Sequence, residues 1–254
     1  TLNEEERMLR NLVRDFADRE LSVRAREADE KEEFSWESWE GMAKLGLTGI
    51  GIDAKHGGSE GGYRQVAIAV EEVARGDAGA RVSVLAHLSL GTNTIYRFGN
   101  EEQKARLVPS LASGKGIAAW ALTEPGSGSD AAALKTSAVK DGDHYVLNGT
   151  KQFISGSGFN DVYVTMVRTG EHKTKGISCL VIDKDTPGVS FGKPEKKLGW
   201  NASPTAQVIF EDARVPVANR VGDEGEGFRF AMMGLDGGRL NIGACSLGGA
   251  QRCL

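Results

Sequence analysis

The residues of this chain best suited to chemistry gather in residues 120–130, which read WALTEPGSGSD. The apolar run from Ile117 to Leu122 has the length of a short strand, and it breaks at Glu124-Pro125 into a bend of glycine and serine. Proline fixes its own φ and favours an extended conformation in the residue before it, while glycine adopts conformations that other residues avoid. Successive backbone N–H groups, with the hydroxyls of Ser127 and the next serine, predict a concave site for an anion such as a phosphate.

A plain turn is the competing interpretation of this bend. Glycine and serine after a strand are ordinary turn residues, because they tolerate the required backbone angles and hydrogen-bond locally. The chain also lacks the GxGxxG dinucleotide pattern and the GxxxxGK[ST] phosphate loop. Loop chemistry alone therefore leaves both interpretations open.

Three motifs in order along the chain resemble those of the acyl-CoA dehydrogenase family. Residues 122–130, LTEPGSGSD, resemble its first signature, and residues 153–155, FIS, fall where the family has an aromatic-Ile-Thr/Ser triplet against its flavin. Residues 235–239, LDGGR, resemble its substrate-contacting Asp-x-x-Arg segment. Most relatives carry tryptophan at the position of Phe153, and this departure resembles the isobutyryl-CoA or short branched-chain subgroup.

The resemblance implies FAD as cofactor and acyl-CoA as substrate. It assigns flavin binding to Trp120, Leu122, Thr123, Gly128, Ser129, Phe153, Ile154 and Ser155. It assigns substrate binding to Ser129, Asp236, Gly237, Gly238 and Arg239. By the same resemblance, the helix around Leu88 to Thr92 would border the acyl chain, although plain helix packing through small residues explains that composition equally well.

In this family a glutamate removes the α-proton of the acyl-CoA while the β-hydride passes to the flavin, giving the 2,3-enoyl-CoA. The resemblance places that glutamate in a C-terminal helical bundle beyond residue 254, so no catalytic residue is assigned within this chain. Glu124 belongs to the flavin loop, where Pro125 gives it a structural role. We expect an incomplete enzyme, inactive as this chain alone.

Other interpretations of the same residues remain open. Asp236 and Arg239 lie three apart, so a helix brings them to one face, where a local surface ion pair is common. The chain could act without catalysis, as a flavin- or CoA-binding fragment or an oligomerisation module. An oxidase or a flavin monooxygenase on the same fold is a third interpretation.

Composition narrows the class of partner. The 254 residues carry a net charge of −4, which favours no nucleic acid, and no apolar run is long enough to span a membrane. The four histidines and three cysteines show no metal-ligand spacing, so we expect no metal. The resemblance implies an electron-transfer flavoprotein as partner and a homo-oligomer, a tetramer or a dimer. It also implies the cytoplasm in a prokaryote or the mitochondrial matrix in a eukaryote.

The chain predicts an α+β fold in three parts: an N-terminal helical domain over 1–116, a middle β-barrel-like or β-sandwich domain over 117–225, and the first helix of a C-terminal bundle over 226–254. Capping boxes at Asn3 and Asn100 predict two helix starts. Trp36 and Trp39 are expected in the core, and residues 80–98 are expected to form one long helix. Turns are predicted at residues 141–142, 148–149 and 187–188.

Overall fold

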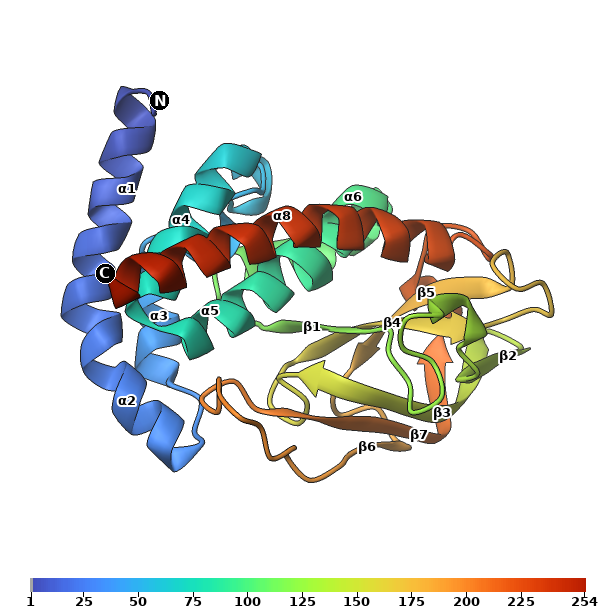
Figure 1. Cartoon of the computed structure of the whole chain (residues 1–254). Helices are drawn as coiled ribbons and strands as arrows, with labels where there is room; N and C mark the ends of the chain where they lie inside the picture. The colour runs from blue at the N-terminus through green and yellow to red at the C-terminus, as the bar shows by residue number, and fades with distance from the viewer. Residues whose placement is uncertain (1) are drawn as a thin grey trace.

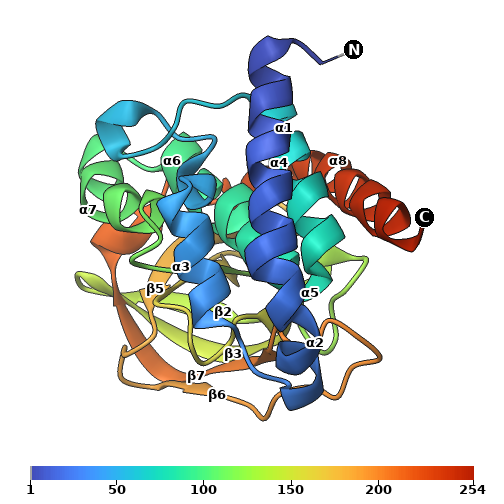
Figure 2. The same ribbon diagram turned by 90° about the vertical axis from the view of Figure 1, so that its left-hand side faces the viewer.

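The computed structural model describes residues 2–254 and places a layer of helices on one side of a twisted sheet (Figures 1 and 2). The helices are α1 (Glu4–Phe16), α2 (Ser22–Lys31), α3 (Trp36–Lys44), α4 (Tyr63–Gly76), α5 (Ala78–Leu85), α6 (Asn93–Phe98), α7 (Glu101–Ala112) and α8 (Gly227–Cys253). The strands are β1 (Ala118–Ala121), β2 (Ser137–Asp141), β3 (His144–Ser155), β4 (Val162–Arg168), β5 (Ile177–Asp183), β6 (Val189–Phe191), β7 (Thr205–Pro216) and β8 (Arg220–Val221). The predicted succession of helices, strands and a final helix is confirmed.

Helix α8 leaves the sheet and runs back across the helical layer, so its end lies beside α1 (Figure 1). Its many glycines would weaken an isolated helix, but one of them allows close packing. A Cβ at Gly248 would come within 2.1 Å of the Glu71 carbonyl oxygen of α4. None of the helices within residues 2–254 is long and apolar enough to cross a membrane.

Local signals placed the helix starts well. Asn3 and Glu6 form the predicted capping box of α1, as do Asn100 and Gln103 at α7. The expectation that both tryptophans of α3 lie in the core is confirmed for one of them and wrong for the other. Trp39 is buried, but Trp36 is 51% exposed, because it begins the helix at the edge of the core and packs edge-on against Phe34.

The expected long helix over 80–98 is not uniform. Between α5 and α6 the chain forms a π-helical segment, Ala86–Thr92. This segment packs directly on β1, and a Cβ at Gly91 would come within 2.6 Å of the Ala118 side chain. Widened turns of this kind are frequent at functional sites.

Seven strands pair in the order β6-β7-β3-β2-β4-β5-β8, and β1 pairs with β4 in parallel. The predicted hairpin turn at 141–142 and the turn at 187–188 are confirmed, with Gly142 and Gly188 at φ +62° and +87°. The predicted turn at Asn148-Gly149 is wrong. Strand β3 continues through it with a shift of register against β7, because Gly149 at φ +145° absorbs the bulge.

Strand β1 separates two apolar cores. The side chains of Ala118 and Leu122 belong to the core shared with the helices, while Ala119 and Ala121 belong to the core within the β domain. This alternation places the end of β1 between the two layers. The bend at residues 123–130 therefore begins where helices and sheet meet.

Candidate functional site

The bend after β1 and the aromatic triplet of β3 lie side by side. The Gln152 N–H donates a hydrogen bond of 2.8 Å to the Thr123 carbonyl oxygen. The Lys151 ammonium donates to the Leu122 carbonyl at 3.1 Å and to the Glu124 carboxylate at 2.7 Å. Residues 122–124 and residues 151–152, which are distant in sequence, are thus joined by three hydrogen bonds.

Phe153 occupies an irregular position in β3. The pairing with β7 shifts between Lys151 and Ile154, and Phe153 itself has φ +58°. Phe153 is 61% exposed, whereas Ile154 is buried. A left-handed conformation is unfavourable for a bulky residue, and strained positions of this kind cluster at functional sites. The bulge turns the Phe153 ring away from the sheet, where a planar ligand can stack on it.

The bend differs from the expected one in its backbone and in one hydroxyl. Glu124 and Ser127 exchange backbone hydrogen bonds of 2.9 and 3.1 Å, and the Ser127 hydroxyl donates to the Asp130 carbonyl. Neither Gly126 nor Gly128 adopts a positive φ, so the expectation of special glycine conformations is wrong, because this small reciprocal turn does not need them. A Cβ on either glycine would meet nothing within 4 Å, which leaves the backbone open to a ligand.

The Ser127 hydroxyl, which we expected at an anion site, is instead turned inward. Ser129 and the two glycines of the bend, Gly126 and Gly128, remain exposed. The exposed surface therefore offers the Ser129 hydroxyl and backbone groups to a ligand. Thr123 is half-buried beside them.

Glu124 is buried and fully engaged. Its carboxylate accepts hydrogen bonds from the backbone N–H groups of Lys135 at 2.6 Å and Thr136 at 2.9 Å, besides the Lys151 ammonium. Burial raises the pKa of this carboxyl, but the Lys151 charge and these hydrogen bonds outweigh it and leave the pKa below its usual range. Burial lowers the pKa of Lys151 to about 8 despite the attraction of Glu124. A carboxylate held in this way is a structural anchor.

Sequence reasoning missed Lys151, although a signal for it exists. Tyr145, Leu147 and Lys151 occupy alternate positions of β3, and all three are buried. The alternation of a strand therefore places a lysine in the core, and a buried ammonium requires a carboxylate partner.

A hollow of about 470 Å³ lies between α5, α8 and the β domain. It brings Ser155 of the triplet together with Gly238 and Arg239 of α8. The rest of its wall is mostly apolar and consists of Arg81, Val82, Leu85, Ala86, Ser89, Leu90, Trp200, Leu235 and Ile242. A Cβ at Gly238 would meet nothing within 4 Å, so this glycine keeps the hollow wide. Asp236 and Arg239 form an exposed ion pair of 2.6 Å on the same helix.

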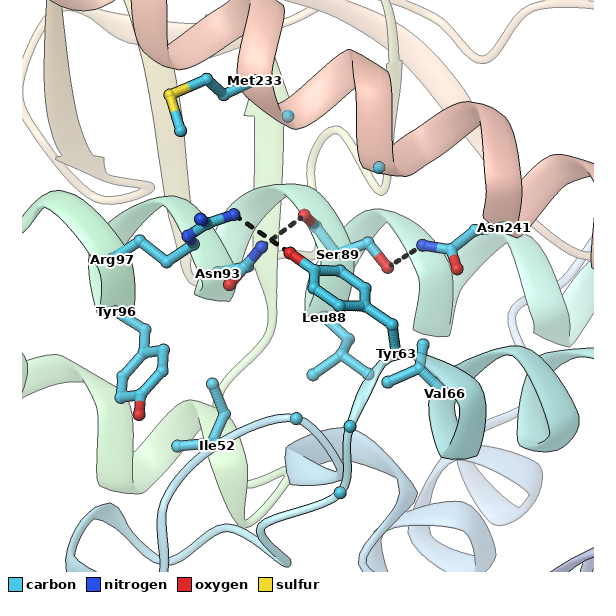
Figure 3. Close-up of a pocket in the computed structure, with 15 residues that line it drawn as sticks. Ile52, Tyr63, Val66, Leu88, Ser89, Asn93, Tyr96, Arg97, Met233 and Asn241 are labelled. Carbon is cyan, nitrogen blue, oxygen red and sulfur yellow. Dashed lines mark hydrogen bonds between the residues drawn. The ribbon is translucent and has the colours of Figure 1, made fainter. Parts of the chain in front are cut away.

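Gly237 faces a second cavity of about 280 Å³, which Figure 3 shows between α4, α6 and α8. Adjacent residues of a helix point about 100° apart, which explains why Gly237 and Gly238 line different cavities. Ser89 lines both cavities, and its hydroxyl accepts a hydrogen bond of 2.8 Å from the Asn241 amide. At the other end, the Arg97 guanidinium donates to the Tyr63 hydroxyl at 3.1 Å (Figure 3).

Trp120 and the exposed groups around the bend show whether the residues of this site fit a bound flavin. The buried indole N–H of Trp120 has no hydrogen-bond partner within residues 2–254. Such an orphan donor is costly unless a further group satisfies it. With an exposed aromatic ring at Phe153 and open space above two glycines, the donor and stacking groups fit a planar, phosphate-bearing cofactor. The described part of the chain holds no cluster of His, Cys, Asp and Glu able to bind a metal.

His87 fastens β1 to the helical layer, another role that sequence reasoning missed. Its Nδ1 accepts the Ala118 backbone N–H at 3.0 Å, so the proton sits on Nε2 and is donated to the Leu111 carbonyl at 3.1 Å. Complete burial lowers the pKa of His87 to about 4. The neutral imidazole therefore fixes where β1 enters the site.

Two family descriptions match the chain. "Acyl-CoA dehydrogenase, N-terminal domain" matches residues 3–115, and "Acyl-CoA dehydrogenase, middle domain" matches residues 119–213. A curated relative, the mitochondrial isobutyryl-CoA dehydrogenase of Dictyostelium discoideum, is 49% identical over the whole chain. Against curated isobutyryl-CoA dehydrogenases, the chain spans 60–61% of the length of the relative.

Solved structures agree with these matches. The butyryl-CoA dehydrogenase of Megasphaera elsdenii is 37% identical and superposes with a TM-score of 0.95, covering 99% of this chain and 67% of its own. An acyl-CoA dehydrogenase of Bacillus anthracis complexed with FAD is 38% identical, with a TM-score of 0.93, and the match covers 99% of this chain and 43% of its own. The expected fold is confirmed by these superpositions.

Proposed function

Because this chain belongs to the acyl-CoA dehydrogenase family, we propose that it supplies the FAD face and the acyl hollow of an enzyme that oxidises a short-chain acyl-CoA to the 2,3-enoyl-CoA. Isobutyryl-CoA is the leading candidate, since curated relatives of that name are 48–49% identical. The observation that carries the proposal is the hollow in which Ser155 of the aromatic triplet and Arg239 of α8 meet. We further propose domain boundaries at residues 116–117 and 225–226.

When bound, FAD would supply the electron acceptor for the substrate β-hydride, chemistry that no amino-acid side chain provides. A relative of known structure is complexed with FAD, which supports the same cofactor here. The Phe153 ring would stack on it, and the Thr123 hydroxyl and Trp120 indole would donate hydrogen bonds. The exposed Ser129 hydroxyl and the backbone around Gly128 would hold phosphate oxygens. The remaining residues of our flavin assignment, Leu122, Ile154 and Ser155, would shape its edge.

The substrate would lie with its acyl chain in the 470 Å³ hollow and its CoA part beside α8. The apolar side chains of Leu90, Leu235 and Ile242 would pack against the acyl chain and reduce its contact with water. Arg239 and Asp236 would contact the polar thioester end, with Gly238 leaving room for it. Gly237 would support this segment from its other side. Glu124 cannot remove the α-proton while it accepts three hydrogen bonds. As the family resemblance implies, a glutamate outside residues 1–254 would remove it.

Reconstitution of the complete gene product with FAD tests the proposal. Anaerobic addition of isobutyryl-CoA should bleach the flavin absorbance, and straight-chain thioesters should bleach it more slowly. Bleaching by straight-chain or aromatic thioesters alone would refute the assignment of subgroup. FAD binding without bleaching by any acyl-CoA would favour the non-catalytic flavin- or CoA-binding module, and fast reoxidation by oxygen would favour an oxidase.

Partners follow from the same proposal. Electrons would pass to an electron-transfer flavoprotein, and the subunits would form a homotetramer or a dimer. The cell compartment would be the cytoplasm in a prokaryote and the mitochondrial matrix in a eukaryote, as the mitochondrial relatives suggest. Size-exclusion chromatography with light scattering measures the assembly, and reduction of purified electron-transfer flavoprotein measures the transfer.

A further inference from the structure

A buried ion pair underlies the candidate flavin face. The side chain of Lys151 is fully buried and that of Glu124 is 7% exposed, with 2.7 Å between the ammonium and a carboxylate oxygen. Most lysines lie at protein surfaces, because removing an ammonium from water is costly unless it is paired. The two residues come from different segments: Glu124 directly follows Thr123 in the bend, and Lys151 lies two residues before Phe153 in β3.

The contacts of this pair fix the bend at both ends. Glu124 stands at the start of the bend and accepts the backbone N–H groups of Lys135 and Thr136, which follow its end. Lys151 additionally donates to the Leu122 carbonyl oxygen, one residue before Thr123. A single carboxylate and a single ammonium thus join the strand β1, both ends of the bend and the strand β3.

The same contacts precede the bulge that turns Phe153 outward. The side chain of Lys151 and the backbone N–H of Gln152 are both directed to residues 122–124, so the chain is fixed up to Gln152. The pairing with β7 resumes at Ile154, whose side chain is buried. Phe153 lies between these two fixed points with φ +58°, a conformation that a bulky residue keeps only when its surroundings impose it.

We propose that Lys151 and Glu124 are positioning residues for the flavin, setting the Phe153 ring and the Thr123–Ser129 bend at the separation that the cofactor requires. This inference rests on the proposed function. A role in stability alone would not need charge, because buried ion pairs are often replaced by apolar residues of similar volume without loss of stability. An apolar pair could not hold the Leu122 carbonyl and the backbone N–H groups after the bend, all of which this pair binds.

The test uses the complete gene product and four variants. Lys151→Met keeps the length of the side chain without its charge, Lys151→Arg keeps the charge, and Glu124→Gln keeps the shape of the carboxyl group. Lys184→Met is the matched control, because Lys184 pairs with Asp161 at 3.3 Å on the surface of the same domain. The measurements are the FAD dissociation constant, the visible spectrum and reduction potential of the bound flavin, and the melting temperature.

We expect Lys151→Met and Glu124→Gln to weaken FAD binding about 10- to 100-fold, by analogy with the loss of a group that orients a metal ligand, and to shift the flavin spectrum and potential. Lys151→Arg should recover part of the affinity, and Lys184→Met should match the wild type. A lower melting temperature with unchanged FAD affinity, spectrum and potential would overturn the inference. If Lys151→Met does not fold, Glu124→Gln decides by the same measurements. Failure of the wild type itself to bind FAD would overturn the proposed function, and this inference with it.

Discussion

Two ion pairs of nearly equal length flank the candidate site. Lys151 and Glu124 are 2.7 Å apart with side chains 0% and 7% exposed, whereas Arg239 and Asp236 are 2.6 Å apart with side chains 72% and 78% exposed. The first pair joins distant segments of the β domain, and the second joins neighbouring turns of α8. Their distances alone would suggest equal interactions.

The two pairs differ in their exposure to solvent, and therefore in their contribution to stability and in their role at the site. An exposed pair contributes about 0–1 kcal/mol, because water and salt compete for both charges. Removing one partner of a buried pair costs about 3–5 kcal/mol, because the other charge stays buried without compensation. The buried pair therefore suits a scaffold, while Arg239 can leave Asp236 at little cost and contact an incoming substrate.

Of the changes considered, Lys151→Ala should lower the free energy of unfolding most. It leaves the Glu124 carboxylate buried without its ammonium, so the free energy of unfolding should fall by about 3–5 kcal/mol in urea titrations. Lys184→Ala, which removes a surface lysine from an ion pair, should change it by less than about 1 kcal/mol. Equal losses in the two variants would remove the distinction between the pairs.

The buried imidazole of His87, which forms no ion pair within residues 2–254, should make the stability of the fold depend on pH. The folded-state pKa of His87, about 4, lies below the ordinary 6.5. Below pH 6.5 the imidazole is protonated in the unfolded chain, but in the folded chain it stays neutral down to about pH 4. The free energy of unfolding should therefore fall by roughly 3 kcal/mol as the pH drops from 6.5 to 4. A His87→Gln variant should lose this part of the pH dependence in urea titrations from pH 7 to 4. Parallel curves for variant and wild type would contradict it.

Phe153→Gly should change the free energy of unfolding by a smaller amount and should raise it, whereas the changes above lower it. Glycine relieves the left-handed backbone at φ +58°, while little apolar contact is lost because the ring is 61% exposed. The free energy of unfolding without cofactor should rise by about 1 kcal/mol, while FAD binding weakens. Phe153→Ala serves as control, since it removes the ring and keeps the strain. A loss of stability with glycine as large as with alanine would show that the backbone is not strained.

The smallest effect should come from Asp236→Ala. The exposed pair with Arg239 should contribute no more than about 0.5 kcal/mol, so unfolding in urea should barely change. Adding salt to the wild type should have an equally small effect on its unfolding, because screening weakens exposed pairs. A loss near that of Lys151→Ala would mean that α8 depends on this pair for its position.

Much of the fold was predictable because its signals are short. The capping boxes at Asn3 and Asn100 and the hairpin at Gly142 are each determined by residues within a few positions of one another. The bend after β1 and its proximity to Phe153 were predicted from the motifs. The turn predicted at Asn148-Gly149 does not form, because the pairing of β3 with β7 continues through these residues despite the local turn signal.

The sequence by itself determined the order of helices and strands, the motifs of the family and the position of the bend after β1. Only the tertiary structure decided that Lys151 is the partner of Glu124, that Phe153 turns outward, and that Gly237 and Gly238 face different cavities. Capping, turns and periodicity depend on neighbours along the chain. The partner of a buried charge and the cavity beside a helix depend on which distant segments pack together, and that is fixed when the whole apolar core forms.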